Sequence, residues 1–297
     1  MLASLPWIAL IAVALVGAAA SRRRVRARAD AAYAARFTAG RDGVAEGAEP
    51  FTMRAPGGRA LLLLHGSGDT PQTMRYLAAR LHAAGFTVHA PLLPGHGRLP
   101  SALCGADVEA RSYLGAAAAG LEMLRADASW IGVVGLSMGG ALAVTLVADS
   151  ADVHALVLLA PYLQPPATVR WVARTARLWG AVVPLLDARG EGSVQDLAAR
   201  GESRAYGMVS PQAMRALVRT AAAGRAALGR VAVPTLVVHS REDIRIPTAI
   251  AERATATLGG PTERQWVAGC GHIITVDRCR AEVADLVLSF LARVAPA

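Results

Sequence analysis

One serine interrupts a run of small and aliphatic residues near the middle of the chain, and it lies between two glycines. The segment reads Gly135-Leu136-Ser137-Met138-Gly139, which fits G-x-S-x-G, the sharp strand-to-helix turn that presents a serine nucleophile. A side chain at either glycine would collide with the other or with a neighbouring strand. A closely packed turn without a catalytic role would need the same glycines. Whether the serine is a nucleophile therefore depends on the residues that could act as its catalytic partners.

A serine hydroxyl attacks a carbonyl only with the help of a base, and the base needs a carboxylate to orient it. In folds with this turn the order along the chain is serine, carboxylate, histidine. Asp243 follows the aliphatic segment Thr235–His239, and His272 follows Glu263–Val267. Ligands of open parallel sheets gather at the carboxyl ends of strands. We therefore predict Ser137 as nucleophile, Asp243 as acid and His272 as base.

Other side chains fit these roles less well. Glu242 could substitute for its neighbour Asp243 but is expected to point away, and Asp277 follows His272 and violates the order. The remaining histidines are expected to be structural: His65, His82, His89, His96, His154 and His239.

The tetrahedral intermediate of such a reaction needs two backbone N–H donors. We assign one to Met138, which follows the nucleophile. The other is assigned to Ser67, in the loop His65-Gly66-Ser67-Gly68 after the first core strand. This loop departs from the HGGG form at its third position.

The elements that must position these residues follow a regular rhythm from residue 50 on. Short aliphatic segments alternate with longer amphipathic ones, which favours a parallel α/β sheet. The predicted strands are Arg59–Leu64, Phe86–Pro91, Trp130–Gly135, His154–Ala160, Thr235–His239 and Glu263–Val267. The predicted helices include Gln72–Ala84, Asp107–Ala126, Met138–Asp149 and Arg278–Ala292.

The rhythm of strands fails between Tyr162 and Val231, where helical patterns such as Ala167–Leu178 and Pro211–Ala223 take over. A connection of this length is too long for a plain loop. We expect residues 163–230 to form a helical cap over the site, with a crossover helix and long loops as the alternative. The cap side chains expected to line an acyl pocket include Trp171, Val172, Leu178, Trp179 and Val182.

The N-terminus differs from the rest of the chain. Leu2–Ala20 carries no charge, and five arginines crowd into Ser21–Arg28. A helix of this length spans about 28 Å, close to the hydrocarbon core of a bilayer. Because the positive charges follow the apolar segment, the pattern predicts an uncleaved single transmembrane helix that holds the catalytic domain at the cytoplasmic face. A cleaved signal peptide followed by export is the alternative.

Composition narrows the possible partners. The chain has 31 positive side chains, all of them arginine, against 22 acidic ones. Outside residues 21–28 the arginines are dispersed, and no aromatic residues alternate with them. We therefore expect no nucleic-acid partner. Cys104, Cys270 and Cys279 are odd in number and lack CxxC spacing, which predicts neither a zinc site nor a disulfide. Buried free thiols are expected instead, and they would suit a reducing cytoplasm.

Together these motifs resemble the α/β-hydrolase superfamily, and within it the bacterial carboxylesterase and monoacylglycerol lipase group. The resemblance covers about residues 50–294. It is carried, in order along the chain, by Leu64-His65-Gly66-Ser67-Gly68, Pro94-Gly95-His96-Gly97, Gly135-Leu136-Ser137-Met138-Gly139-Gly140, Asp243 and Gly271-His272-Ile273-Ile274-Thr275-Val276-Asp277.

The resemblance implies an α/β-hydrolase fold, with a mostly parallel sheet flanked by helices and a small helical cap. It also implies a serine hydrolase of carboxylic esters that needs no metal and no cofactor, with the triad at Ser137, Asp243 and His272. We expect three parts: an anchor and basic flank at 1–28, a tether at 29–49 and the hydrolase domain at 50–294. The expected substrates are short- to medium-chain acyl esters or monoacylglycerols. A thioesterase or amidase, or a non-catalytic binding protein on the same scaffold, are the alternatives.

Overall fold

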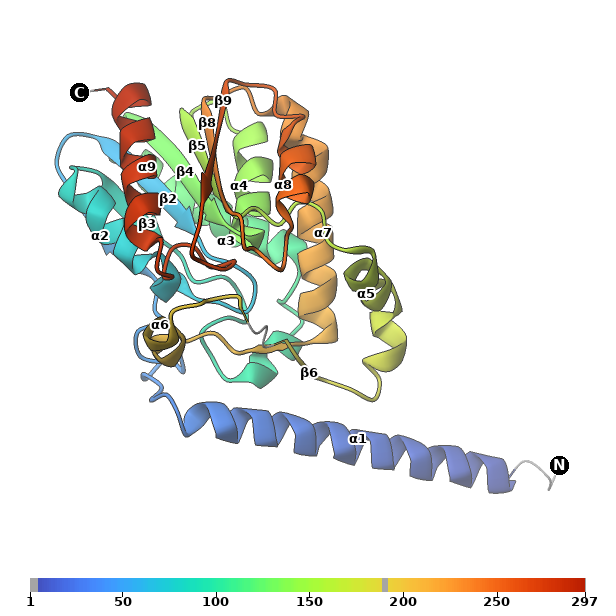
Figure 1. The fold of residues 1–297 in the computed structure, drawn as a ribbon. Helices are drawn as coiled ribbons and strands as arrows, with labels where there is room; N and C mark the ends of the chain where they lie inside the picture. The colour runs from blue at the N-terminus through green and yellow to red at the C-terminus, as the bar shows by residue number, and fades with distance from the viewer. Residues whose placement is uncertain (1–4, 189–191, 297) are drawn as a thin grey trace.

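The computed structural model describes residues 5–188 and 192–296, and a seven-stranded sheet forms its centre (Figure 1). The strands lie in the order β1 (Phe51–Met53), β3 (Thr87–Ala90), β2 (Arg59–Leu64), β4 (Trp130–Leu136), β5 (Ala155–Leu159), β8 (Thr235–Ser240) and β9 (Thr262–Val267). β1 is antiparallel to β3, and the other neighbours are parallel. The predicted mostly parallel sheet is confirmed, and each predicted strand is present within one residue of its expected bounds.

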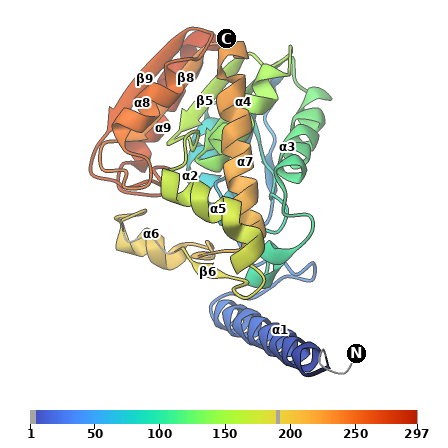
Figure 2. The same ribbon diagram turned by 90° about the vertical axis from the view of Figure 1, so that its right-hand side faces the viewer.

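Helices cover both faces of the sheet (Figures 1 and 2). On one face lie α2 (Arg75–Ala83) and α9 (Arg280–Val294), and on the other α3 (Ala110–Arg125), α4 (Met138–Ala148) and α7 (Pro211–Ala227). Leu61 and Leu63 of β2 pack in one core and Leu62 and Leu64 in the other, because successive side chains of a strand point to opposite faces. Coverage on both faces explains why the central strands are almost wholly aliphatic.

The chain between β5 and β8 is mostly helical. It contains α5 (Ala167–Trp179), β6 (Leu186–Asp187), α6 (Leu197–Glu202), β7 (Met208–Val209), α7 and the short 3-10 helix η3 (Leu228–Arg230), with β6 and β7 paired antiparallel. In Figures 1 and 2, α5, α6 and β6 lie beyond one end of the sheet. Residues 189–191 of the predicted cap lie outside the described residues.

The remaining short elements connect these layers. Two further 3-10 helices, η1 (Pro71–Met74) and η2 (Pro100–Cys104), precede α2 and α3, and α8 (Thr248–Thr255) packs against β8.

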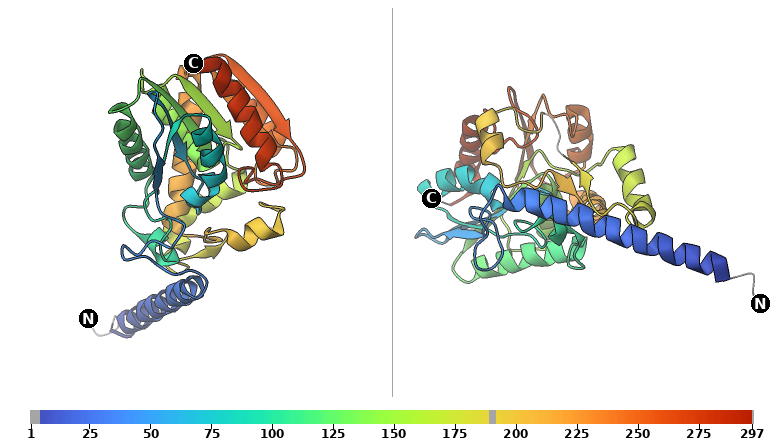
Figure 3. Two further views of the ribbon diagram at one scale, coloured as in Figure 1. Left: turned by 90° about the vertical axis from the view of Figure 1, so that its left-hand side faces the viewer. Right: turned by 90° about the horizontal axis from the view of Figure 1, so that it is seen from below.

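The first helix does not end where the apolar segment ends. α1 (Leu5–Ala34) continues through the arginines and packs on the domain at its C-terminal end (Figures 1 and 3). There Asp30 accepts a hydrogen bond from the Ser101 N–H at 2.9 Å, and the buried Tyr33 ring lies 5.3 Å from the Tyr206 ring.

The prediction of a transmembrane helix is wrong. Within residues 5–188 and 192–296, no helix combines the length and the apolarity that crossing a bilayer requires. The anchor predicted at Leu2–Ala20 is wrong, as are the membrane as a partner and the single-pass localisation. Residues 2–4 of that segment lie outside the described residues.

The cysteines differ from expectation as well. Cys270 and Cys279 form a disulfide, with their Cα atoms 5.8 Å apart, whereas Cys104 is a free thiol. The expectation of three free thiols is wrong for this pair. The turns over residues 274–279 bring Cys279 back beside Cys270, and a spacing of nine residues does not reveal that geometry.

Candidate active site

Ser137 lies on the sharp turn between β4 and α4. Its backbone has φ 53° and ψ −116°, a left-handed conformation that is uncommon for a residue with a side chain. A Cβ at Gly135 would overlap the carbonyl of Gly139, and a Cβ at Gly139 would overlap the carbonyl of Leu64, the last residue of β2. The collisions predicted from the motif are thus present, and only glycine fits at either position.

The structure brings Ser137, His272 and Asp243 together from three separate parts of the chain. Nε2 of His272 lies 2.8 Å from Oγ of Ser137, and Nδ1 of His272 lies 2.7 Å from Oδ2 of Asp243. All three side chains are buried, with 7%, 3% and 5% exposure. The geometry is that of a hydroxyl hydrogen-bonded to an imidazole, which is oriented in turn by a carboxylate.

The second oxygen of Asp243 is held by the main chain. Oδ1 accepts hydrogen bonds from the N–H groups of Arg245 at 2.7 Å and Ile246 at 2.9 Å. Burial raises the pKa of the Asp243 carboxyl, but its hydrogen bond and charge interaction with His272, the Ile246 N–H and the nearby His239 together bring that pKa below its ordinary value. The group therefore stays anionic at neutral pH. Glu242 is exposed and accepts a hydrogen bond from Ser240 at 3.2 Å.

The loop that contains Ser67 lies against the serine turn. A Cβ at Gly66 would be 3.4 Å from Cβ of Ser137. Ser67 lines the same cavity as Ser137, and Met138 begins α4 directly after the serine. Within the described residues, the backbone N–H groups of Ser67 and Met138 have no acceptor.

Two buried histidines tie this loop to the segment that follows β3. His65 accepts a hydrogen bond on Nε2 from the Leu93 N–H at 3.1 Å, and His96 accepts one on Nε2 from the Gly68 N–H at 3.0 Å. Burial lowers the pKa of His96 to about 4. Burial also lowers the pKa of His65, and the neighbouring His96 adds to that effect. Both rings are therefore neutral and structural, as expected. The sequence does not predict that these histidines hold this loop, although His96 belongs to the motif Pro94-Gly95-His96-Gly97.

A cavity of about 480 Å³ opens at Ser137 and His272, a size typical of small-molecule sites. Its wall is largely apolar and comes mainly from the chain between β5 and β8 and from the loop after His272. The apolar lining includes Val169, Val194, Met208, Val209, Met214, Leu217, Ile273 and Val276.

None of the five cap side chains expected to line this cavity is among the described residues that line it: Trp171, Val172, Leu178, Trp179 and Val182 all lie elsewhere. Trp171, Leu178 and Val182 are exposed by 67%, 76% and 56%, so their assignment to an acyl pocket is wrong. α5 packs against α7, and this docking turns Val169 rather than Trp171 toward the cavity.

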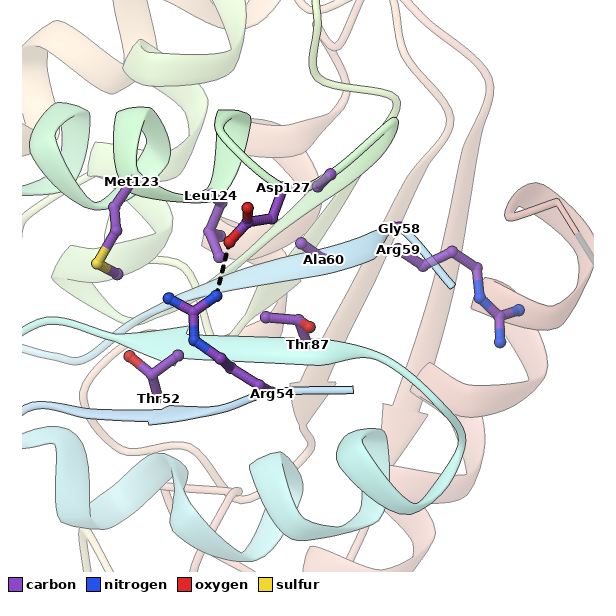
Figure 4. Close-up of a pocket in the computed structure, with 10 residues that line it drawn as sticks. Thr52, Arg54, Gly58, Arg59, Ala60, Thr87, Met123, Leu124 and Asp127 are labelled. Carbon is purple, nitrogen blue, oxygen red and sulfur yellow. Dashed lines mark hydrogen bonds and ion pairs between the residues drawn. The ribbon is translucent and has the colours of Figure 1, made fainter. Parts of the chain in front are cut away.

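A second, much smaller cavity lies at the other end of the sheet (Figure 4). It is bordered by Gly58 and Arg59 at the start of β2, by Thr87 at the start of β3, and by the exposed ion pair of Arg54 with Asp127. Its volume of about 20 Å³ has room for about one water molecule. It lies at the amino ends of the strands, whereas Ser137 lies at a carboxyl end.

A parallel sheet with a serine on a strand-to-helix turn, followed in order by an acid and a histidine base, defines the α/β-hydrolase class. Residues 57–278 match the family model described as "Serine aminopeptidase, S33" (Hydrolase_4), and the chain belongs to this family.

Named relatives point to the same class. The chain is 29% identical to the thermostable monoacylglycerol lipase of Bacillus sp. (strain H-257), over 84% of this chain and 96% of that protein. It is 26% identical to the carboxylesterase of Bacillus subtilis (strain 168), over 82% and 96%.

Solved structures agree in fold. A structure titled "LipS and LipT, two metagenome-derived lipolytic enzymes increase the diversity of known lipase and esterase families" is 25% identical, with a TM-score of 0.76 over 84% of this chain and 98% of the other. The Paleococcus ferrophilus monoacylglycerol lipase, at 19% identity, has a TM-score of 0.71 over 83% and 98%. The protein is a carboxylic ester hydrolase.

Proposed function

We propose that the protein hydrolyses esters of short- to medium-chain acids or monoacylglycerols through a Ser137–His272–Asp243 triad and an acyl-enzyme intermediate. The observation that carries this proposal is the pair of hydrogen bonds, 2.8 and 2.7 Å long, that links the three side chains. Ser137 and His272 lie at the wall of the cavity. No residue of the triad is missing or misdirected, which argues against a binding protein that merely uses this scaffold.

Acylation begins at the Ser137 hydroxyl. Oγ attacks the ester carbonyl while Nε2 of His272 takes its proton, and the Asp243 carboxylate stabilises the imidazolium that forms. The negative charge that develops on the carbonyl oxygen is stabilised by the N–H groups of Ser67 and Met138. His272 then gives its proton to the departing alkoxide, which leaves as the alcohol.

Deacylation repeats these steps with water. His272 takes a proton from a water molecule, whose oxygen attacks the acyl carbonyl. The second tetrahedral intermediate uses the same two N–H donors. When it collapses, the bond to Ser137 Oγ breaks, the carboxylic acid is released and the proton returns from His272 to Ser137.

The acyl chain is assigned to the apolar wall of the cavity. We propose that residues 163–230 are the cap, since Met208, Met214 and Leu217 from this segment face the cavity that holds Ser137. Names of two relatives support this substrate class: one is called a monoacylglycerol lipase and the other a carboxylesterase. We further propose that residues 50–294 form one catalytic domain.

An activity-based fluorophosphonate probe tests the nucleophile directly. The wild-type protein should be labelled, and Ser137→Ala should abolish both labelling and the hydrolysis of p-nitrophenyl butyrate. Ser289→Ala is the matched control, because this serine is exposed on α9, and it should be labelled like the wild type. Equal labelling of Ser137→Ala and Ser289→Ala would disprove the assignment.

A further inference from the structure

Asp277 lies within the short loop that carries His272. This loop begins at Cys270, ends at Cys279 and is closed by the disulfide between them. The Asp277 side chain is fully buried, at 0% exposure, and the mechanism above gives it no part. A buried carboxylate so close to the base therefore needs a separate explanation.

Four backbone N–H groups of the described chain donate to this carboxylate. Gly271, the residue before His272, donates to Oδ2 at 2.7 Å, and Arg278 donates to Oδ1 at 2.9 Å. The other two donors come from a segment about eighty residues away: Gln195 donates to Oδ2 at 2.8 Å and Asp196 to Oδ1 at 2.9 Å. Such charge-assisted bonds are stronger than bonds between neutral groups.

The balance of burial and hydrogen bonding keeps the group ionised. Burial raises the pKa of Asp277, but the N–H donors of Gly271, Gln195, Arg278 and Asp196 outweigh it and lower that pKa below its ordinary value. At neutral pH the side chain is therefore a carboxylate whose two oxygens are both occupied by the main chain.

The distant segment, residues 192–196, packs directly on the loop of the base. The Ile273 N–H donates to the carbonyl of Ser193 at 2.9 Å, and a Cβ at Gly271 would overlap the carbonyl of Gly192. Ser193 and Val194 line the cavity together with His272. Asp277 thus lies between a wall of the cavity and the main chain that carries the base.

We propose that Asp277 is a positioning residue for ester hydrolysis. Its carboxylate fixes the main chain before His272 to residues 195 and 196, and so keeps Nε2 of His272 within reach of Ser137. The disulfide holds the two ends of the loop, whereas the carboxylate also ties the loop to the cavity wall. This proposal rests on the proposed function, because it takes His272 to be the base.

The test is Asp277→Asn, which keeps the shape but places an amide nitrogen where an oxygen accepted N–H groups. Titration with the fluorophosphonate probe gives the fraction of active sites, from which kcat per site is calculated. We expect kcat per site to fall by about 10- to 100-fold, the size of effect that a small misplacement of a reacting group produces. KM should change less. The rate of probe labelling should fall in parallel, because labelling needs the same proton transfer to His272.

Asp285→Asn is the matched control, since Asp285 is an exposed carboxylate on α9 paired with Arg80. It should keep the wild-type kcat per site. A lower melting temperature of Asp277→Asn with an unchanged kcat per site would mean that Asp277 only stabilises the fold, and would overturn the proposal.

A second variant covers the case in which Asp277→Asn does not fold. Gln195→Pro removes one of the four N–H donors and leaves Asp277 and His272 in place, so kcat per site should fall severalfold, and an unchanged value would overturn the proposal. Failure of the proposed function is distinguishable, because Ser137→Ala would then still be labelled. Failure of the present proposal leaves the Ser137 result intact.

Discussion

The imidazole of His96 and the backbone of Gly68 are joined by a hydrogen bond of 3.0 Å that spans 28 residues of chain. The donor is the Gly68 N–H, and Nδ1 of His96 donates in turn to the carbonyl of Pro94 at 2.9 Å, which fixes the tautomer. Gly68 adopts φ +72° and directly follows Ser67. His96 therefore supports the loop that presents the proposed oxyanion donor.

His96→Ala should consequently impair catalysis rather than substrate binding. Loss of one oxyanion donor costs about 100- to 1,000-fold in kcat, and a loosened donor should cost less, about tenfold, with a smaller change in KM. Steady-state kinetics with p-nitrophenyl butyrate provide the measurement. His82→Ala, on α2, is the control and should behave like the wild type. A normal kcat for His96→Ala would show that the loop needs no such support.

The proposed acid, Asp243, can be distinguished from its neighbour Glu242 by a pair of isosteric variants. Asp243→Asn should lower kcat by about 10⁴-fold, since the amide cannot hold His272 in the required tautomer. Glu242→Gln should have little effect, because Glu242 is exposed and contacts Ser240. If the two variants exchanged these outcomes, the acid role would pass to Glu242.

Local patterns predicted the strands and the residues that meet at the site. Ser137 and Asp243 each follow an aliphatic strand, and His272 follows the more polar strand β9. Because parallel strands end at one edge of a sheet, the order of these residues along the chain is enough to predict that they lie close together. The glycines of the serine turn were likewise predictable, because the reason for them is steric and local.

Features that depend on packing between distant segments were not predictable in this way. The carboxylate of Asp277 accepts hydrogen bonds from the N–H groups of Gln195 and Asp196. No spacing in the sequence predicts that contact. The packing of α5 on α7 determines which face of α5 meets the cavity. Helical periodicity alone does not determine that face, and the prediction based on it chose Trp171, which is exposed. The apolar segment at the N-terminus is part of a longer helix that continues to Ala34, and composition does not mark that continuation.

Asp69, directly after the Ser67–Gly68 loop, should make stability depend on pH. Its side chain is buried and, within the described residues, Oδ2 has no hydrogen-bond partner. Burial raises the pKa of Asp69 from 3.8 to about 7, against the opposing hydrogen bonds of Thr70 and Thr73. The folded state therefore binds this proton more tightly than the unfolded state. The contribution of Asp69 to stability falls as pH rises through the window from about 4 to 7.

Asp69→Asn replaces the titrating carboxyl by an amide and should abolish this contribution to the pH dependence of stability. The free energy of unfolding of Asp69→Asn minus that of the wild type should be about 2 kcal/mol larger at pH 8 than at pH 5, because only the wild type loses stability through this group as pH rises. Urea denaturation at the two pH values gives this difference. Asp127→Asn, an exposed carboxylate paired with Arg54, should show no such change. A difference that is independent of pH would mean that Asp69 is ionised across this range.

The apolar wall of the cavity should set the preferred length of the acyl chain. Leu217 lies on α7 and lines the cavity together with Met214 and Ser137, so Leu217→Trp should fill part of the space that a longer chain would use. The ratio of kcat/KM for p-nitrophenyl octanoate to that for the acetate should fall at least tenfold, a size consistent with the loss of a few methylene contacts at about 1 to 3 kcal/mol each. Leu178→Trp places the same bulk on α5 at a side chain that is 76% exposed, and it should leave the ratio unchanged. If both variants retained the wild-type ratio, the acyl chain would have to bind outside this wall.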